Sequence, residues 1–166
     1  DGKLTAGKPA QAIEDRIAQV TQEAYDNGDY IFVAMDRHDE GDTFHPETKL
    51  FPPHNIVGTS GRELYGKLAG VYDAIKDDNR VFWMDKRHYS AFSGTDLDIR
   101  LRERRVTTVI LTGVLTDICV LHTAIDAYNL GYDIEVVASA TASLTPEAHD
   151  FAIGHFKNVL GATIVE

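Results

Sequence analysis

The segment TGVLTDICV, residues 112–120, decides the interpretation of this chain, because it holds the single cysteine, Cys119, between two apolar runs. Residues 109–111 before it are typical of a buried strand, and residues 120–130 have the length and apolar character of a helix. A thiol at such a strand-to-helix turn lies against the helix N-terminus, where the partial positive charge favours thiolate over thiol. A thiolate beside free backbone amides has the parts of an acyl-transfer site, although a lone cysteine can also be a small buried hydrophobic residue.

Outward from this turn, the chain alternates short apolar runs with segments of helical character. Strands are predicted near residues 30–35, 80–84, 107–111, 134–137 and 162–165, and helices near 9–27, from 61 onward, near 96–104, 117–130 and 146–160. Short, wholly apolar strands that alternate with helices favour a parallel sheet covered on both faces. The predicted fold class is therefore α/β, with three α/β/α layers in a single domain over residues 1–166.

The length and composition fit one globular domain and exclude several classes of protein. The chain has 166 residues, of which 43% are hydrophobic, and no apolar run approaches the ~20 residues that span a bilayer. No signal peptide is visible, so a membrane partner is not expected. The formal net charge of −10 argues against a nucleic-acid partner. A single cysteine excludes an internal disulfide framework and favours a reducing, cytoplasmic location.

Polar side chains follow three of the predicted strands: Asp36 and His38 follow the first, Lys86 the second and Cys119 the third. Because binding sites of open parallel sheets lie at the carboxyl ends of the strands, we expect these groups to converge. A cation near Cys119 would stabilise a thiolate and then an oxyanion. Lys86 could equally reach solvent, and its position alone does not separate the two roles.

The predicted loop over residues 36–59 is unusually long for a segment without regular structure. It carries imidazoles and carboxylates but no thiol: Asp36, His38, His45, Glu47 and His54. Such ligands suit Zn²⁺, Fe²⁺ or Mn²⁺. Since an Asp-x-His pair is common by chance, a solvated loop with scattered histidines is the alternative.

Four aromatic residues lie near Lys86 in the sequence: Phe82, Trp83, Tyr89 and Phe92. They would suit a flat apolar substrate. Most of them could equally belong to the core, so the sequence leaves their roles open.

Lys86 at a strand end and the turn GVLTDICV, residues 113–120, resemble those of the isochorismatase-like cysteine hydrolases, over essentially the whole chain. The pair Asp36 and His38, with the later His54, is similar to that of the nicotinamidases within this group. The resemblance implies an isochorismatase-like fold and hydrolysis of a small molecule, nicotinamide, to nicotinate and ammonia in NAD salvage. The resemblance leaves open whether the chain forms a homo-oligomer.

The resemblance also implies roles for particular residues. Cys119 matches the nucleophile and Lys86 the lysine of the catalytic triad, and the amides of Leu115 and Cys119 match the oxyanion hole. The family pattern further implies a cis peptide between Val114 and Leu115. The nucleophile would form a thioester, which divides one difficult amide hydrolysis into two easier steps.

A divalent transition metal is implied as well, with Zn²⁺ preferred over Fe²⁺ or Mn²⁺. The matching ligands are Asp36, His38, Glu47 and His54. Many relatives have a histidine where we choose Glu47, so His45 is the alternative ligand. Phe51 and Tyr89 match aromatic residues that sandwich the pyridine ring.

One part of the family pattern has no match here. The family triad includes an aspartate at the end of an N-terminal apolar strand, whereas this chain opens DGKLTAG, residues 1–7, and Asp1 has no strand before it. We therefore expect the sheet to lack this strand and its general base. Two alternatives follow: a related hydrolase or amidase with another substrate, and a non-catalytic binding or assembly protein on the same fold.

Overall fold

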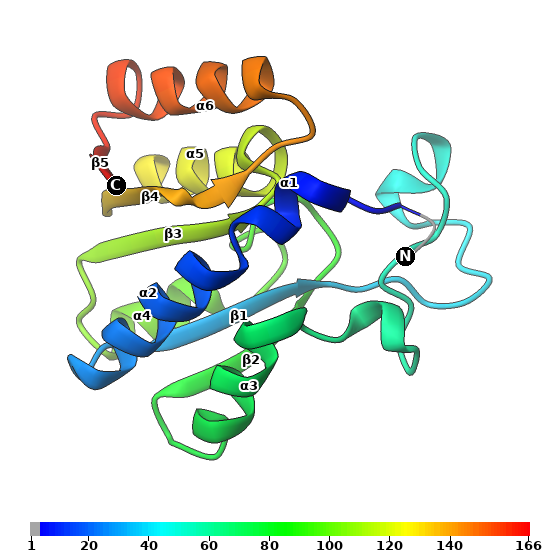
Figure 1. The fold of residues 1–166 in the computed structure, drawn as a ribbon, viewed down its shortest axis with the longest axis horizontal. Coiled ribbons are helices and arrows are strands. Elements are labelled where there is room, and N and C mark those ends of the chain that lie inside the picture. Colours follow the sequence, from blue (N-terminus) through cyan, green and yellow to red (C-terminus); the bar gives the residue numbers. More distant parts are fainter. Residues whose placement is uncertain (1–3) are drawn as a thin grey trace.

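The computed structural model describes residues 4–166, and Asp1 therefore lies outside the described residues (Figure 1). The strands are β1 (Ile31–Asp36), β2 (Val81–Lys86), β3 (Thr108–Val114), β4 (Asp133–Ala142) and β5 (Thr163–Val165). The helices are α1 (Gly7–Ala12), α2 (Glu14–Asp26), α3 (Gly66–Ile75), α4 (Leu97–Glu103), α5 (Leu121–Asn129) and α6 (Pro146–Asn158). Shorter turns of 3₁₀ or π helix are η1 (Pro46–Lys49), η2 (Ser60–Arg62) and η3 (Thr116–Val120).

Every strand pair is parallel, as predicted, and the described strands form two sheets, with a gap between β1 and β3 that agrees with the expected lack of one strand. β1 pairs with β2, which sets Asp36 opposite Lys86, and β4 lies between β3 and β5. In residues 4–166, no ladder of hydrogen bonds joins β1 to β3. One edge of each of these two strands therefore lacks a strand partner, although the sequence of β1 is almost wholly apolar.

The two sheets nevertheless share one hydrophobic core. Met84 of β2, Val109 of β3 and Phe156 of α6 belong to the same buried cluster, and Phe32 of β1 packs against it. Figure 1 shows α1 and α2 in front of the strands, with α4 and α5 behind them and α6 at the outer edge beside β5. No helix in the described part of the chain combines the length and the apolar character needed to cross a membrane.

The element boundaries differ from the predicted ones at several points. The first predicted helix is divided into α1 and α2 at Ile13, whose ψ of 1° is not helical. The helix expected from residue 61 begins at Gly66, because η2 precedes it. β4 runs to Ala142, beyond the predicted end, since its last residues pair with the end of β3 after an irregularity in the register.

Candidate active site

The carboxyl ends of β1 and β2 and the turn after β3 bring Asp36, Lys86 and Cys119 together, as predicted. Lys86 is buried, with 5% of its surface exposed, and its Nζ lies 3.7 Å from the Sγ of Cys119. The same ammonium group forms an ion pair with Asp36 and donates a hydrogen bond to the His88 carbonyl at 3.0 Å. Lys86 is therefore a fixed cation between the thiol and a carboxylate, and its ammonium group does not extend into solvent.

Cys119 lies at the start of a helical segment that η3 and α5 form together. The Leu115 carbonyl accepts hydrogen bonds from the amides of Ile118 at 3.1 Å and Val120 at 3.2 Å. The peptide between Val114 and Leu115 is cis, as the resemblance implied. The π-helical hydrogen bonding of η3 is rare in proteins and is frequently found at functional sites.

Polar side chains that the sequence analysis did not single out hold this turn in place. The fully buried Thr116 shares a 3.0 Å hydrogen bond with Nδ1 of His149 on α6. Ser143 Oγ donates to the Asp117 carboxylate at 2.6 Å. These contacts attach the turn to α6 and to the segment after β4, which gives the nucleophile a rigid base.

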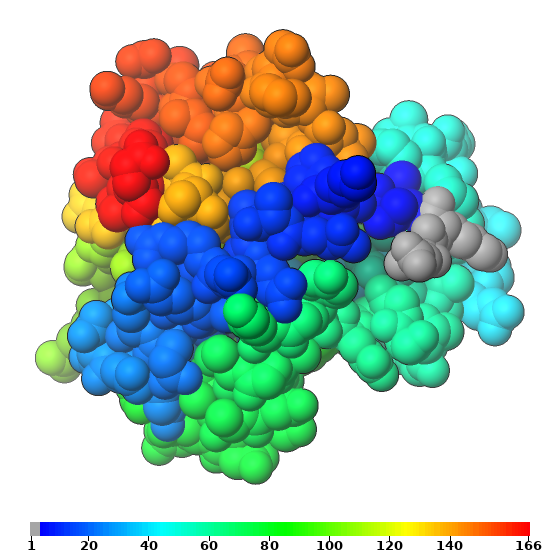
Figure 2. All heavy atoms as spheres, viewed as in Figure 1, coloured from blue at the N-terminus to red at the C-terminus, as the bar shows by residue number. Residues whose placement is uncertain are grey.

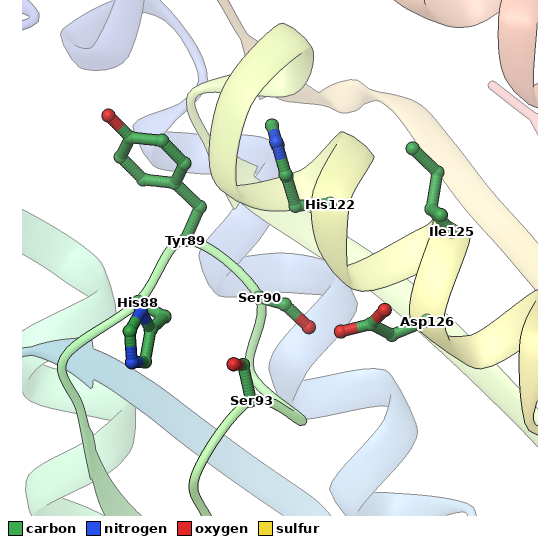
Figure 3. Close-up of a pocket in the computed structure, with 7 residues that line it drawn as sticks. All are labelled: His88, Tyr89, Ser90, Ser93, His122, Ile125 and Asp126. Carbon is green, nitrogen blue, oxygen red and sulfur yellow. The ribbon is translucent and has the colours of Figure 1, made fainter. Parts of the chain in front are cut away.

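Thr123 connects the nucleophile helix with the loop after β2. Its hydroxyl donates to the Cys119 carbonyl at 2.7 Å and accepts from the Ala91 amide at 3.0 Å. This loop carries Tyr89, whose ring centroid lies 5.2 Å from that of His122. A hollow of about 250 Å³ lies between the loop and α5 (Figure 3). Its lining residues are His88, Tyr89, Ser90, Ser93, His122, Ile125 and Asp126.

The protonation state of Cys119 differs from the expected one. Burial raises the pKa of its thiol to about 11, and the attraction of Lys86 offsets only part of this effect. The negative charges of Asp36 and Glu47 raise the pKa further. In this arrangement the thiol keeps its proton at neutral pH, so a general base is needed to make it a nucleophile.

A second group of side chains forms a candidate metal centre. His38, Glu47 and His54 each offer a ligand atom, and these atoms all lie within 4.8 Å of one another. His54 Nδ1 donates to the Pro52 carbonyl at 3.0 Å, which leaves the lone pair on Nε2. That Nε2 lies 3.6 Å from the Glu47 carboxylate.

The state of His38 fits the role of a metal ligand. Its ring is buried, and its Nδ1 has no hydrogen-bond partner in the described structure. Burial, with the nearby His54 and His45, lowers the pKa of His38 to about 4, so the imidazole is neutral. Backbone hydrogen bonds with Asn55 and Val57 hold His38 beside the segment that carries His54.

Asp36, the fourth predicted ligand, borders the group without joining it. One of its carboxylate oxygens pairs with Lys86, and the other lies 3.9 Å from His54 Nε2. The Asp36 carbonyl accepts a 2.8 Å hydrogen bond from Nε of Arg62, and the guanidinium of Arg62 also pairs with Asp85. Arg62 thereby holds the end of β1 and with it the backbone of Asp36.

His45, the alternative ligand, lies behind the group. Its ring stacks on His38 at a centroid distance of 3.8 Å, and its Nδ1 accepts from the Glu47 amide at 3.2 Å. Its Nε2 is buried without a hydrogen-bond partner in the described structure. The geometry therefore brings Glu47 into the ligand group and leaves His45 as its support.

The aromatic residues near Lys86 divide into two sets. Three of them have other partners: Phe82 stacks on Phe32 at 4.7 Å, Phe92 on Tyr132 at 5.7 Å, and Trp83 lies 5.6 Å from the Arg62 guanidinium. Tyr89 lines the hollow instead. Phe51 lies beside the ligand group, since its amide donates to the Glu47 carbonyl at 2.9 Å.

Comparisons with known proteins agree with this geometry. The Isochorismatase domain model matches residues 3–165. A relative from Bacillus subtilis (strain 168), the uncharacterized isochorismatase family protein PncA, is 54% identical over 166 residues, which cover 100% of this chain and 91% of the relative.

Solved structures are similar over almost the whole chain. The crystal structure of pyrazinamidase/nicotinamidase from Streptococcus mutans UA159 is 79% identical with a TM-score of 0.98, over 99% of this chain and 91% of the other. The pyrazinamidase of Pyrococcus horikoshii, solved in complex with zinc, is 26% identical with a TM-score of 0.81, over 95% of this chain and 86% of the other.

Proposed function

The chain belongs to the isochorismatase family, and from this premise we propose that it hydrolyses nicotinamide to nicotinate and ammonia. Proteins named nicotinamidase or pyrazinamidase are among its most similar structures, which supports an amide of an aromatic ring as the substrate. The reaction would return nicotinamide to NAD salvage.

One observation carries the proposal. Lys86 connects the thiol of Cys119 to Asp36, and Asp36 in turn borders the ligand group that contains His54. A nucleophile and a candidate metal centre thus lie on either side of one buried ion pair. A ring held at the metal centre could present its carboxamide to the thiol.

The donor set and the partnerless nitrogen of His38 fit a divalent transition ion, with Zn²⁺ preferred. His38, Glu47 and His54 would hold it, together with Asp36 through the carboxylate oxygen that lies near His54. When bound, the ion supplies a Lewis-acid contact for the ring nitrogen of the substrate. The neutral state of His38 suits this role, because an imidazolium has no lone pair to donate.

In the proposed reaction a carboxylate removes the Cys119 proton while Lys86 stabilises the thiolate. The thiolate attacks the carboxamide carbon, and the amides of Leu115 and Cys119 donate to the oxygen that becomes negative. Collapse of this intermediate breaks the C–N bond, the base returns the proton to the departing nitrogen, and ammonia leaves. Water then hydrolyses the thioester, which releases nicotinate and restores the thiol.

We propose that the carboxylate comes from a further parallel strand between β1 and β3. The facing edges of these two strands lack a strand partner in residues 4–166, and backbone donors and acceptors of buried strands need partners. A residue at the carboxyl end of such a strand would lie between Asp36 and Cys119. Asp36 is a poor substitute for this base, since Lys86 already occupies it.

Ammonia release from nicotinamide, with mass spectrometry of the protein during turnover, tests the proposal. We expect a nicotinoyl adduct on Cys119, and we expect Lys86→Gln to slow its formation. Hydrolysis without an adduct would exclude the thioester. Binding without hydrolysis, in a protein that contains the further strand, would favour a non-catalytic role.

A further inference from the structure

The outer face of α6 carries apolar surface that no other part of the described chain covers. Phe151 is 65% exposed, whereas Ala152 and Phe156 on the opposite face of the helix are fully buried. α6 is the outermost element on its side of the molecule in Figure 1, and its surface is open to solvent in Figure 2. Leu144 before the helix and Val159 after it are also more than half exposed.

A glycine lies on the same face, one turn after Phe151. Gly154 is in the interior of α6, and a Cβ built on it would meet nothing within 4 Å. Its backbone is helical, so neither crowding nor an unusual φ requires glycine there. Because glycine destabilises a helix interior relative to alanine, a single copy of the chain gains nothing from it. A glycine on an exposed helix face leaves a notch into which a side chain from outside can fit.

The charges along α6 are arranged in two halves. Glu147 and Asp150 lie in the N-terminal half, and His155 and Lys157 lie in the C-terminal half. The N-terminal half also holds His149, but its ring is hydrogen-bonded to the buried Thr116 and does not belong to the outer face. Two parallel copies of the helix would place like charges together, whereas two antiparallel copies place the acidic half of each beside the basic half of the other. The antiparallel arrangement also opposes the two helix dipoles.

We propose that this face of α6 is a self-association surface, where two copies of the chain pair their α6 helices antiparallel about a two-fold axis between residues 152 and 153. In that register Phe151 faces Gly154 of the partner subunit, and the ring fits the notch that the glycine leaves. The same symmetry sets Asp150 opposite His155 of the partner subunit. One patch thus complements itself, as an isologous dimer requires.

The pairing extends over one helix of 13 residues and the apolar residues at its ends. Interfaces of this size are small, so the dimer forms and dissociates with protein concentration. The surface is separate from the proposed reaction, because none of the residues that form it belongs to the thiol or to the metal centre. The pairing of the two copies can therefore be tested independently of nicotinamide hydrolysis.

Sedimentation velocity of the full chain over a wide concentration range tests the proposal. We expect a monomer–dimer equilibrium, and we expect Phe151→Lys to raise its dissociation constant at least about tenfold, as for a central interface residue. Circular dichroism checks that the variant is folded. A wild-type chain that stays monomeric at every concentration overturns the proposal.

Gly154→Ala gives a second test with two opposite effects. At concentrations where the chain is monomeric, alanine should raise the melting temperature by about 2–4 °C, because it is the better helix former. The same change should weaken the dimer, because the methyl group fills the notch. Gly70→Ala in α3 is the matched control, since Gly70 is also helical with open space around its Cβ. Gly70→Ala should raise the melting temperature and leave the dissociation constant of the dimer unchanged. If both variants change the dissociation constant equally, Gly154 does not receive a side chain of the partner subunit.

The charge register has its own test. Asp150→Lys should weaken the dimer by setting a cation opposite His155 of the partner subunit. The double variant Asp150→Lys with His155→Asp restores opposite charges across the two-fold axis and should recover the dimer. The antiparallel register is wrong if the double variant dimerises as weakly as the single variant, or if Asp150→Lys has no effect on the dimer.

Discussion

Replacement of Cys119 by alanine removes the only thiol of the chain and should abolish hydrolysis while the fold is kept. The side chain is small and sits on a turn that Thr116 and Thr123 hold by other atoms, so the expected loss of stability is at most about 1–2 kcal/mol. Ammonia release and a thermal melt measure the two effects. The nucleophile assignment is wrong if the variant, tested in a protein with the further strand, releases ammonia at a near-normal rate.

Glu47→Gln and His45→Ala should differ in their effects on the metal. Glu47 offers a ligand atom to the group, whereas His45 contacts it through ring stacking and the Glu47 amide. Loss of the carboxylate should therefore release more metal than loss of the imidazole. Elemental analysis after dialysis against a chelator gives the comparison, and the opposite order would transfer the ligand role to His45.

Arg62→Lys should weaken metal retention although Arg62 does not belong to the ligand group. A lysine keeps the charge but cannot donate to the Asp36 carbonyl and to Asp85 at the same time with the planar geometry of a guanidinium. We expect a raised KM with a smaller change in kcat, and faster loss of metal to a chelator. Arg37→Lys is the control and should have the weaker effect, because the Arg37 side chain pairs with Asp85 and Asp39 and, in the described structure, is not bonded to Asp36.

The sequence could identify those site residues that belong to a short local pattern, and it could not identify residues that act on the site from far along the chain. Asp36 and His38 stand two positions apart after an apolar strand, and Cys119 sits in a turn of recognisable sequence, so both were visible. Arg62 acts on Asp36 from 26 positions away, and His149 on Thr116 from 33. Such partners follow from tertiary packing alone, which is also why the effect of burial on the pKa of Cys119 was not anticipated.

At the scale of elements, the N-terminus of α6 has a capping residue whose loss can be measured. Thr145 accepts a hydrogen bond from the Ala148 amide at 3.2 Å, and Pro146 occupies the first helical position. Thr145→Ala should lower the free energy of unfolding by about 0.5–2 kcal/mol. Chemical denaturation measures the change, and Thr145→Ser should retain most of the stability; equal losses would contradict a capping role.

The elements themselves were largely predictable, because all five strands are apolar runs with polar or glycine-rich ends. Their boundaries were less so. β4 extends to Ala142 because its end pairs with Gly113 and Val114 across a shifted register, and no local signal encodes that shift. The start of α3 was placed too early because η2 ends at Arg62, whose side chain is engaged with the end of β1.

At the scale of the whole molecule, the strands of residues 4–166 form two parallel sheets that share one core, and the division between the sheets passes beside the candidate active site. β1 ends at Asp36, and β3 leads into the turn that carries Cys119. The family pattern predicts a missing strand, with the gap near Cys119 and Lys86. The unpartnered edges of β1 and β3 in the described residues place it between the two halves of the site.

Filling the gap between β1 and β3 should restore both the general base and the backbone pairing. A protein extended at its N-terminus by about 20 residues, enough for one strand and its connection, should hydrolyse nicotinamide about 10²–10⁴-fold faster than the 166-residue chain, because the strand would bring the general base. The extended protein should also be more stable, since the strand satisfies the backbone groups of both facing edges. An extended variant with its strand-end aspartate changed to asparagine separates the two effects: it should keep the stability and lose the rate. If the 166-residue chain reaches the full rate by itself, the general base already lies within those residues. The Cys119 proton then goes to a carboxylate such as Asp36, released from Lys86 when substrate binds.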